Sequence, residues 1–164
     1  MRSSSVRRSV VMSVLVALAV LIASCGPAPK RIGEVNTLTN SSGQKVDVRI
    51  LRMVDNAPPG AFSTPPAGRK LVAVELRYFN SGPQTYEPCP GIEMDLFDTA
   101  NRLYSDSFNY VAGWPGTNIS CSGTRLLPGS KLQGYVTFEL PTTAIPNKIQ
   151  MNIGYGGNTG VWVR

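Results

Sequence analysis

Three cysteines and the absence of histidine define the chemistry open to this chain of 164 residues. A thiolate is both a nucleophile and a metal ligand, so a cysteine can be acylated, oxidised to a disulfide or bound to a metal. Without histidine the chain lacks the commonest general base, the usual Ser–His and Cys–His nucleophile arrangements and the commonest ligand of transition metals. We therefore expect a chain that is no enzyme and holds no metal or cofactor.

Cys25 stands directly after small residues at the end of an apolar run, 10–23, that follows three arginines close to the N-terminus. A basic start, a short apolar segment and small residues before a cleavage site are the parts of a secretory signal. A cysteine at the cut is typical of the bacterial lipobox, in which the thiol is acylated and the cysteine becomes the new N-terminus. The run of 14 residues is shorter than the roughly 20 needed to cross a bilayer. The sequence predicts a cleaved signal peptide over 1–24 and a lipidated tether over 25–31, with plain secretion and an uncleaved anchor as alternatives.

Cys89 and Cys121 remain as an even pair in the oxidising compartment that this signal predicts. A bond between them would close a loop of 33 residues, which on the chain-entropy relation stabilises the fold by about 3.7 kcal/mol. Free thiols or a shared metal are the alternatives. A metal is a poor fit because no histidine and no Cys-x-x-Cys spacing accompany the pair. We expect a structural disulfide.

Cleavage after residue 24 would leave 140 residues, enough for one domain, 32–164, with a core of its own. Because three early arginines leave with the signal, the mature chain carries 13 basic and 10 acidic residues, a net charge of +3. Nucleic-acid binding needs lysines and arginines clustered on one face, whereas these are few and scattered. We therefore expect no nucleic-acid partner.

Short runs of alternating apolar and polar residues, separated by Gly, Pro, Asn and Ser, indicate β-strands along the whole mature chain. We predict a long Pro/Gly-rich loop at 56–68 and strands at 32–38, 44–54, 69–80, 92–97, 102–105, 131–140, 147–155 and 160–163. Because no segment has the apolar spacing of a helix, these seven or eight strands predict an antiparallel β-sandwich. Each sheet should turn one face to the core and one to water. The predicted core consists of Val46, Val48, Ile50, Val72, Val74, Leu76, Ile92, Met94, Leu96, Val136, Phe138, Ile149, Met151 and Ile153.

Aromatic residues among Gly, Asn and Ser mark the stretch before Cys121 as a candidate binding loop. Phe108, Tyr110 and Trp114 lie there, and rigid rings beside small polar residues are typical of surfaces that contact a partner. The alternative is that these rings close the open end of the sandwich. A binding loop predicts an exposed Trp114.

Three acidic residues are weaker candidates for a site, in this case a calcium site. Asp95, Asp98 and Asp106 lie near one predicted hairpin and could supply oxygen ligands to calcium, although their spacing matches no calcium loop. Acids in turns commonly hydrogen-bond the neighbouring backbone instead.

Two longer segments carry a resemblance to a known group. The segment 66–82 is a strand that ends in the turn Asn80-Ser81-Gly82, and Leu127-Pro128-Gly129 precedes a strand that ends Phe138-Glu139-Leu140-Pro141. With this order of motifs, the region 32–163 resembles the immunoglobulin-like secreted domains of Gram-positive bacteria and actinomycetes that include the mycobacterial immunoprotective extracellular antigen. The resemblance implies an immunoglobulin-like sandwich and an extracytoplasmic location, and no catalytic residues carry over from that group to this chain. The pair Cys89 and Cys121 and the aromatic loop are not part of that pattern.

Together these features predict a lipoprotein on the extracytoplasmic face of a bacterial, actinomycete-type cell membrane, held there by lipid at Cys25. We expect a non-catalytic binding module that contacts an envelope or host-facing partner through Phe108, Tyr110 and Trp114. The alternative is a carrier of a small apolar or lipid ligand between the sheets, which requires an internal cavity on the order of several hundred Å³. A hydrolase is disfavoured because histidine is absent.

Overall fold

The computed structural model describes residues 28–87, 92–114, 116–119, 125–154 and 156–164. The predicted signal peptide 1–24 and all three cysteines, Cys25, Cys89 and Cys121, lie outside these described residues. Every regular element in the described ranges is a β-strand, so the all-β class is confirmed. No helix with the length and apolar character to span a membrane is present among the described residues.

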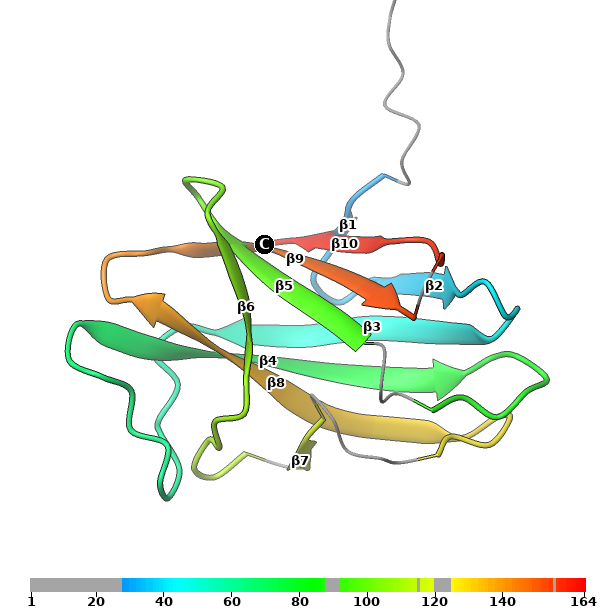
Figure 1. Cartoon of the computed structure of the whole chain (residues 1–164), viewed down its shortest axis with the longest axis horizontal. Coiled ribbons are helices and arrows are strands. Elements are labelled where there is room, and N and C mark those ends of the chain that lie inside the picture. The colour runs from blue at the N-terminus through cyan, green and yellow to red at the C-terminus, as the bar shows by residue number, and fades with distance from the viewer. Residues whose placement is uncertain (1–27, 88–91, 115, 120–124, 155) are drawn as a thin grey trace, which may run out of the picture.

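Ten strands follow one another along the described chain (Figure 1). They are β1 Lys30–Arg31, β2 Val35–Thr39, β3 Lys45–Val54, β4 Arg69–Asn80, β5 Ile92–Asp98, β6 Leu103–Ser107, β7 Thr117–Asn118, β8 Lys131–Pro141, β9 Pro146–Ile153 and β10 Gly160–Val163. All eight predicted strands are present. The two additional strands, β1 and β7, have two residues each and pair in parallel with β10 and β8. The predicted count is therefore too low, because a two-residue strand has no periodicity to detect, and β1 lies within the segment predicted as a tether.

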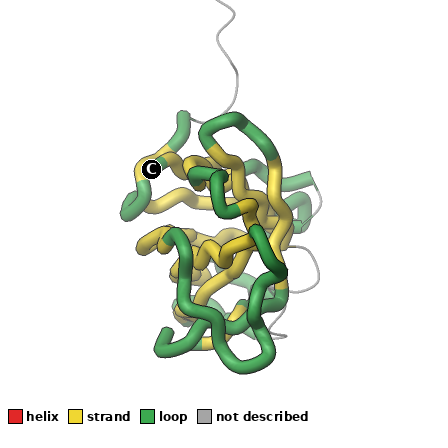
Figure 2. Tube along the Cα trace, turned by 90° about the vertical axis from the view of Figure 1, so that its left-hand side faces the viewer, coloured by secondary structure: helices red, strands yellow, loops and turns green. Residues whose placement is uncertain are grey.

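The strands form two layers that share one strand (Figure 1, Figure 2). Sheet A contains β1, β10, β9 and β5, and sheet B contains β2, β3, β4, β8 and β7. β6 belongs to both sheets, because Leu103 and Ser105 pair with β5 whereas Asp106 and Ser107 pair with β8. One continuous order, β1-β10-β9-β5-β6-β8-β4-β3-β2, therefore runs around the sandwich.

The core between the sheets contains the alternating residues that the sequence predicted. Every predicted core side chain that the structure describes is buried, and the side chain of Ile92 lies outside the described set. Trp162 is among the largest fully buried side chains, and its indole Nε1 donates a hydrogen bond of 3.1 Å to the Glu34 carbonyl oxygen. A Cβ atom at Gly160 would lie 2.7 Å from the Trp162 ring, so this ring requires a glycine beside it.

The outer face of sheet B departs from the prediction that it faces water. Leu71 and Ala73 lie on that face of β4 and are fully buried. The second apolar cluster consists of Ala57, Leu71, Ala73, Val111 and Tyr135. Its members come from sheet B, from the loop 55–68 and from the segment 108–119. These two chain segments cover part of the sheet, and this explains why β4 is apolar on both faces.

Candidate binding surface

The loop 55–68 and the segment 108–119 are joined to each other below sheet B in the view of Figure 1. The Gly60 amide donates a hydrogen bond of 2.7 Å to the Tyr110 carbonyl oxygen. The Tyr110 amide donates one of 2.8 Å to the Ser63 hydroxyl. Because these hydrogen bonds run in both directions, the two segments form one unit, which we call the aromatic loop pair.

Further hydrogen bonds attach the segment 108–119 to β8. The buried Thr137 hydroxyl donates to the Asn109 carbonyl oxygen at 3.1 Å. The Asn109 side-chain amide donates to Glu139 Oε1 at 2.8 Å, and Val111 is buried in the second apolar cluster. The segment therefore has one side fixed against the sheet and another side that faces solvent.

Three aromatic side chains stand on the solvent side of the aromatic loop pair. Phe108 is 74% exposed, Tyr110 is 60% exposed, and Phe62 in the loop 55–68 is fully exposed. Full burial of such a side chain is worth roughly 1.5–3 kcal/mol, which folding alone does not gain here. All three rings are carried by segments that are hydrogen-bonded to each other. Large exposed aromatic side chains gathered on one hydrogen-bonded unit make that unit a candidate interaction site.

Trp114 lies at the boundary between this surface and the sheet. Its ring is only partly exposed, packs against the second apolar cluster and meets the Tyr135 ring edge-on, with centroids 5.8 Å apart. The Arg52 guanidinium lies 4.4 Å from the centroid of the Trp114 ring, and Arg52 Nε forms a 2.6 Å ion pair with Glu75. Trp114 is not the exposed side chain that a binding loop predicts, and it packs outside the core that lies between the sheets. It supports the loop pair against the outer face of sheet B.

Phe62 is the residue of this surface that sequence reasoning missed. Its backbone has a φ of +61°, a left-handed conformation that bulky side chains rarely adopt. The conformation costs roughly 1–2 kcal/mol for a residue other than glycine. Such strained residues cluster at functional sites. The sequence signal that could have identified it is a lone aromatic residue inside the Pro/Gly-rich stretch 56–68.

The acidic residues near the β5–β6 hairpin do not converge on one point. Asp98 Oδ2 accepts a hydrogen bond of 3.0 Å from the Tyr104 hydroxyl and pairs with Arg102 Nε at 2.7 Å. Asp95 and Asp106 instead line a groove of about 370 Å³ on the outside of the hairpin. Within the described residues, no group of three or more Asp, Glu, His or Cys side chains has the geometry of a metal site. The geometry gives the calcium option for these three aspartates no support.

Two aspartates of this hairpin have pKa values displaced in opposite directions. Burial raises the pKa of Asp95, and the nearby negative charges of Glu93 and Asp106 raise it further. Burial also acts to raise the pKa of Asp98, but hydrogen bonds from Arg102 and from a tyrosine hydroxyl outweigh it, so this pKa lies below its usual value. Asp98 is thereby held ionised at the centre of the turn.

The fold is shared with solved structures of low sequence identity. MPT63, a secreted protein from Mycobacterium tuberculosis, matches with a TM-score of 0.62 at 17% identity, over 86% of this chain and 100% of that protein. An uncharacterised β-sandwich protein from Clostridium difficile 630 matches with a TM-score of 0.51 at 14% identity, over 83% of this chain and 94% of the other. No model of a known protein family and no curated protein matches the chain. At these identities the likeness establishes a β-sandwich fold and nothing about function.

Proposed function

We propose that this chain is an extracytoplasmic binding module that contacts a partner through the aromatic loop pair and performs no catalysis. The observation that carries the proposal is Phe62, whose ring is fully exposed on a left-handed backbone. Phe108 and Tyr110 are two further exposed rings on the aromatic loop pair. Buried aromatic anchors dominate the energetics of many protein interfaces, and a partner that covered these rings would recover the burial that folding leaves unused.

The proposal includes a lipid at Cys25 and a disulfide between Cys89 and Cys121, both of which rest on the sequence. The described chain begins beside β1 at the edge of sheet A, whereas the aromatic loop pair covers the outer face of sheet B (Figure 1). A module tethered through β1 would turn the loop pair away from its own membrane. The partner would then belong to the outer envelope or to a host.

We also infer that the sandwich belongs to the immunoglobulin-like group of secreted domains. The two segments 66–82 and 127–141 carry that inference, and the likeness in fold to a protein described as secreted supports it. An extracytoplasmic location follows from the same inference and from the predicted signal.

A carrier that holds an apolar ligand between the sheets is the less favoured function. One groove lined by Arg49 and Arg77 and another lined by Asp95 and Asp106 are open to solvent on the outside of the sandwich. The side chains between the sheets, Trp162 and Phe138 among them, are fully buried. These observations favour contact through the surface.

Photo-crosslinking on intact cells tests the contact surface. A photoreactive phenylalanine analogue at position 62 or 108 should form a specific adduct, because both rings stand in solvent on the loop pair. The control position is Leu127, which is 61% exposed and lies in the turn that precedes β8. Adducts in equal yield from all three positions, or from Leu127 only, would contradict the proposal.

A further inference from the structure

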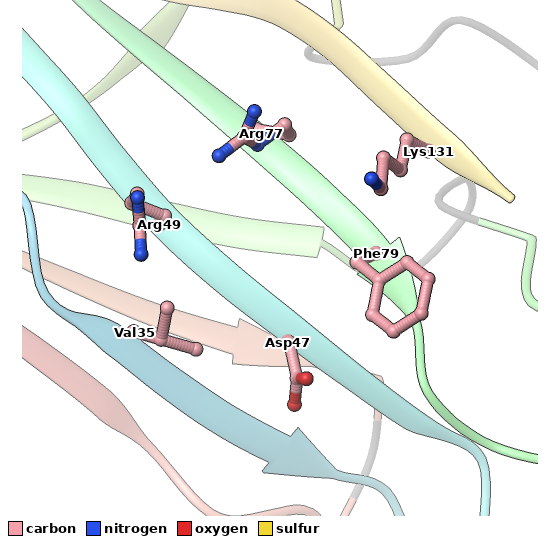
Figure 3. Close-up of a pocket in the computed structure, with 6 residues that line it drawn as sticks. All are labelled: Val35, Asp47, Arg49, Arg77, Phe79 and Lys131. Carbon is pink, nitrogen blue, oxygen red and sulfur yellow. The ribbon is translucent and has the colours of Figure 1, made fainter. Parts of the chain in front are cut away.

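Two arginines stand directly opposite each other on the part of sheet B that the aromatic loop pair leaves open. Arg49 on β3 and Arg77 on β4 are register partners in the antiparallel ladder. They line a groove of about 290 Å³ together with Val35, Asp47, Phe79 and Lys131 (Figure 3). The groove therefore gathers three cationic groups and a single carboxylate on one sheet face.

No carboxylate among the described residues forms an ion pair with either arginine of the groove. All ten acidic residues of the chain fall within the described ranges, and the ion pairs formed there include neither of the two arginines. Asp47 accepts hydrogen bonds from the hydroxyls of Thr37 at 2.7 Å and Ser81 at 3.1 Å. Glu75, the next outward-facing acid on β4, pairs with Arg52 at 2.6 Å.

Arg49 also holds a buried donor without an acceptor. Its Nε is enclosed and forms no hydrogen bond with any described residue. Buried polar groups in native structures nearly all have partners, so an exception needs an explanation. Like charges directly opposite each other on neighbouring strands also destabilise a sheet. Two unfavourable features thus meet in one groove, and a bound anion would relieve the repulsion between the two arginines.

We propose that this groove binds a small phosphate monoester that carries an apolar or aromatic substituent. The guanidinium group presents a planar fork of N–H donors that matches phosphate oxygens. A phosphate monoester carries about two negative charges near neutral pH, which match the net charge of +2 from the three cations and Asp47. A carboxylate has one charge and two oxygens, so it would leave at least one cation without a partner.

The groove also supplies contacts for the apolar part of the ligand. Lys131 Nζ lies 5.8 Å from the centroid of the Phe79 ring, so a phosphate bound by Lys131 would bring its substituent close to that ring. Val35, on β2, is 40% exposed and adds a second apolar side chain to the lining. The volume of about 290 Å³ lies at the lower end of small-molecule sites, which limits the substituent to about one ring.

Titration of phenyl phosphate into the purified full chain at constant ionic strength tests this assignment. The wild type should bind the probe saturably, with a rise in the thermal midpoint, and inorganic phosphate should bind more weakly because it lacks the ring. Arg77→Gln should weaken phenyl phosphate binding by at least about tenfold, the loss expected for a charge-assisted hydrogen bond. The same substitution should raise the midpoint of the phosphate-free protein, because it removes the repulsion of Arg49.

Two further variants distinguish binding in this groove from a general effect of positive charge on the affinity. Arg69→Gln removes one positive charge at the other end of β4, outside the groove, and should leave the affinity within about twofold. Arg49→Lys keeps the charge but loses the planar fork, so an intermediate affinity is expected. Equal weakening by Arg77→Gln and Arg69→Gln would overturn the assignment. Absence of binding by the wild type, or binding only to vesicles of anionic phospholipid, would overturn it as well.

Discussion

Gly60 and Tyr110 approach so closely that a side chain at position 60 would require Tyr110 to shift. The Gly60 amide donates a 2.7 Å hydrogen bond to the Tyr110 carbonyl oxygen. A Cβ atom on residue 60 would lie 3.0 Å from Tyr110 Cβ and 3.1 Å from its carbonyl oxygen. Both distances are tighter than ordinary van der Waals contact, so the junction of the aromatic loop pair depends on this glycine.

Gly60→Ala should separate the two halves of the aromatic loop pair. Insertion of a methyl group into a tight contact costs about 1–3 kcal/mol, so we expect a lower free energy of unfolding and less crosslinking from position 62. Denaturant unfolding measures the first effect. Ala67→Ser, at an exposed position of the same loop, should leave both quantities unchanged. A Gly60→Ala protein as stable as the wild type would contradict the close approach.

Phe62→Asn should stabilise the fold and at the same time weaken contact with a partner. Asparagine tolerates the left-handed backbone better than phenylalanine does, and the ring that it replaces is fully exposed. We expect the free energy of unfolding to rise by up to about 1 kcal/mol. Phe108→Asn is the control, because Phe108 is exposed but has no positive φ. A loss of stability in Phe62→Asn alone would show that this ring packs within the fold.

The intact mass of the protein extracted from membranes reports on all three cysteines. We expect a chain that begins at Cys25, carries covalent lipid and is two hydrogen atoms lighter than its reduced form, because Cys89 and Cys121 are bonded. Reduction should lower the free energy of unfolding by about 3.7 kcal/mol. Cys89→Ser should abolish the difference between the oxidised and reduced forms. An unlipidated chain that retains residues 1–24 would contradict the predicted anchor.

The strands and the core could be predicted because their signal is local. Alternation within β3, β4, β5, β8 and β9 identifies the inward side chains, and the described members of that set are buried. The cover on sheet B could not be predicted in the same way. Leu71 and Ala73 pack with Ala57 of the preceding loop and with Val111 of a distant segment. No periodicity within β4 identifies what covers its second face.

The groove on sheet B shows a second limit of sequence reasoning. The alternation in β3 and β4 places Arg49 and Arg77 on outer faces, but it does not show that they lie opposite each other. That relationship depends on the register of the two strands, which includes an irregularity between Ile50 and Arg52. The long loop 55–68 between the strands sets no register of its own, because only short hairpin turns do so.

Asp98→Asn should change how the free energy of unfolding depends on pH. The pKa of Asp98 is lower in the folded than in the unfolded chain. Ionised Asp98 therefore stabilises the folded state above its unfolded-state pKa of about 4. This stabilisation is lost as the pH falls through its folded-state pKa. The substitution should lower the free energy of unfolding at neutral pH and flatten its decline in acid. Denaturant unfolding at a series of pH values from about 2 to 7 measures this profile.

Asp95→Asn, in the same hairpin, should change the free energy of unfolding at neutral pH in the opposite direction to Asp98→Asn. Burial raises the pKa of Asp95, and neighbouring acids add to the shift. Protonated Asp95 therefore contributes stability that is fully present below its unfolded-state pKa of about 4. This stability is lost as the pH rises through its folded-state pKa. The substitution should raise stability at neutral pH relative to the wild type. Identical pH profiles for Asp95→Asn and Asp98→Asn would contradict both assignments.

Tyr78→Phe should leave the protein as stable as the wild type or make it more stable. Tyr78 is fully buried near the Tyr86 ring, with centroids 6.5 Å apart, and its hydroxyl forms no hydrogen bond with any described residue. Burial raises the pKa of Tyr78 well above its ordinary value of 10.0, so the ring stays neutral. Loss of an unpaired buried hydroxyl removes a desolvation cost of about 1–3 kcal/mol. Tyr104→Phe is the matched control, because the Tyr104 hydroxyl donates to Asp98 at 3.0 Å and its loss should destabilise the fold. Equal destabilisation by the two substitutions in denaturant unfolding would show that the Tyr78 hydroxyl has a partner after all.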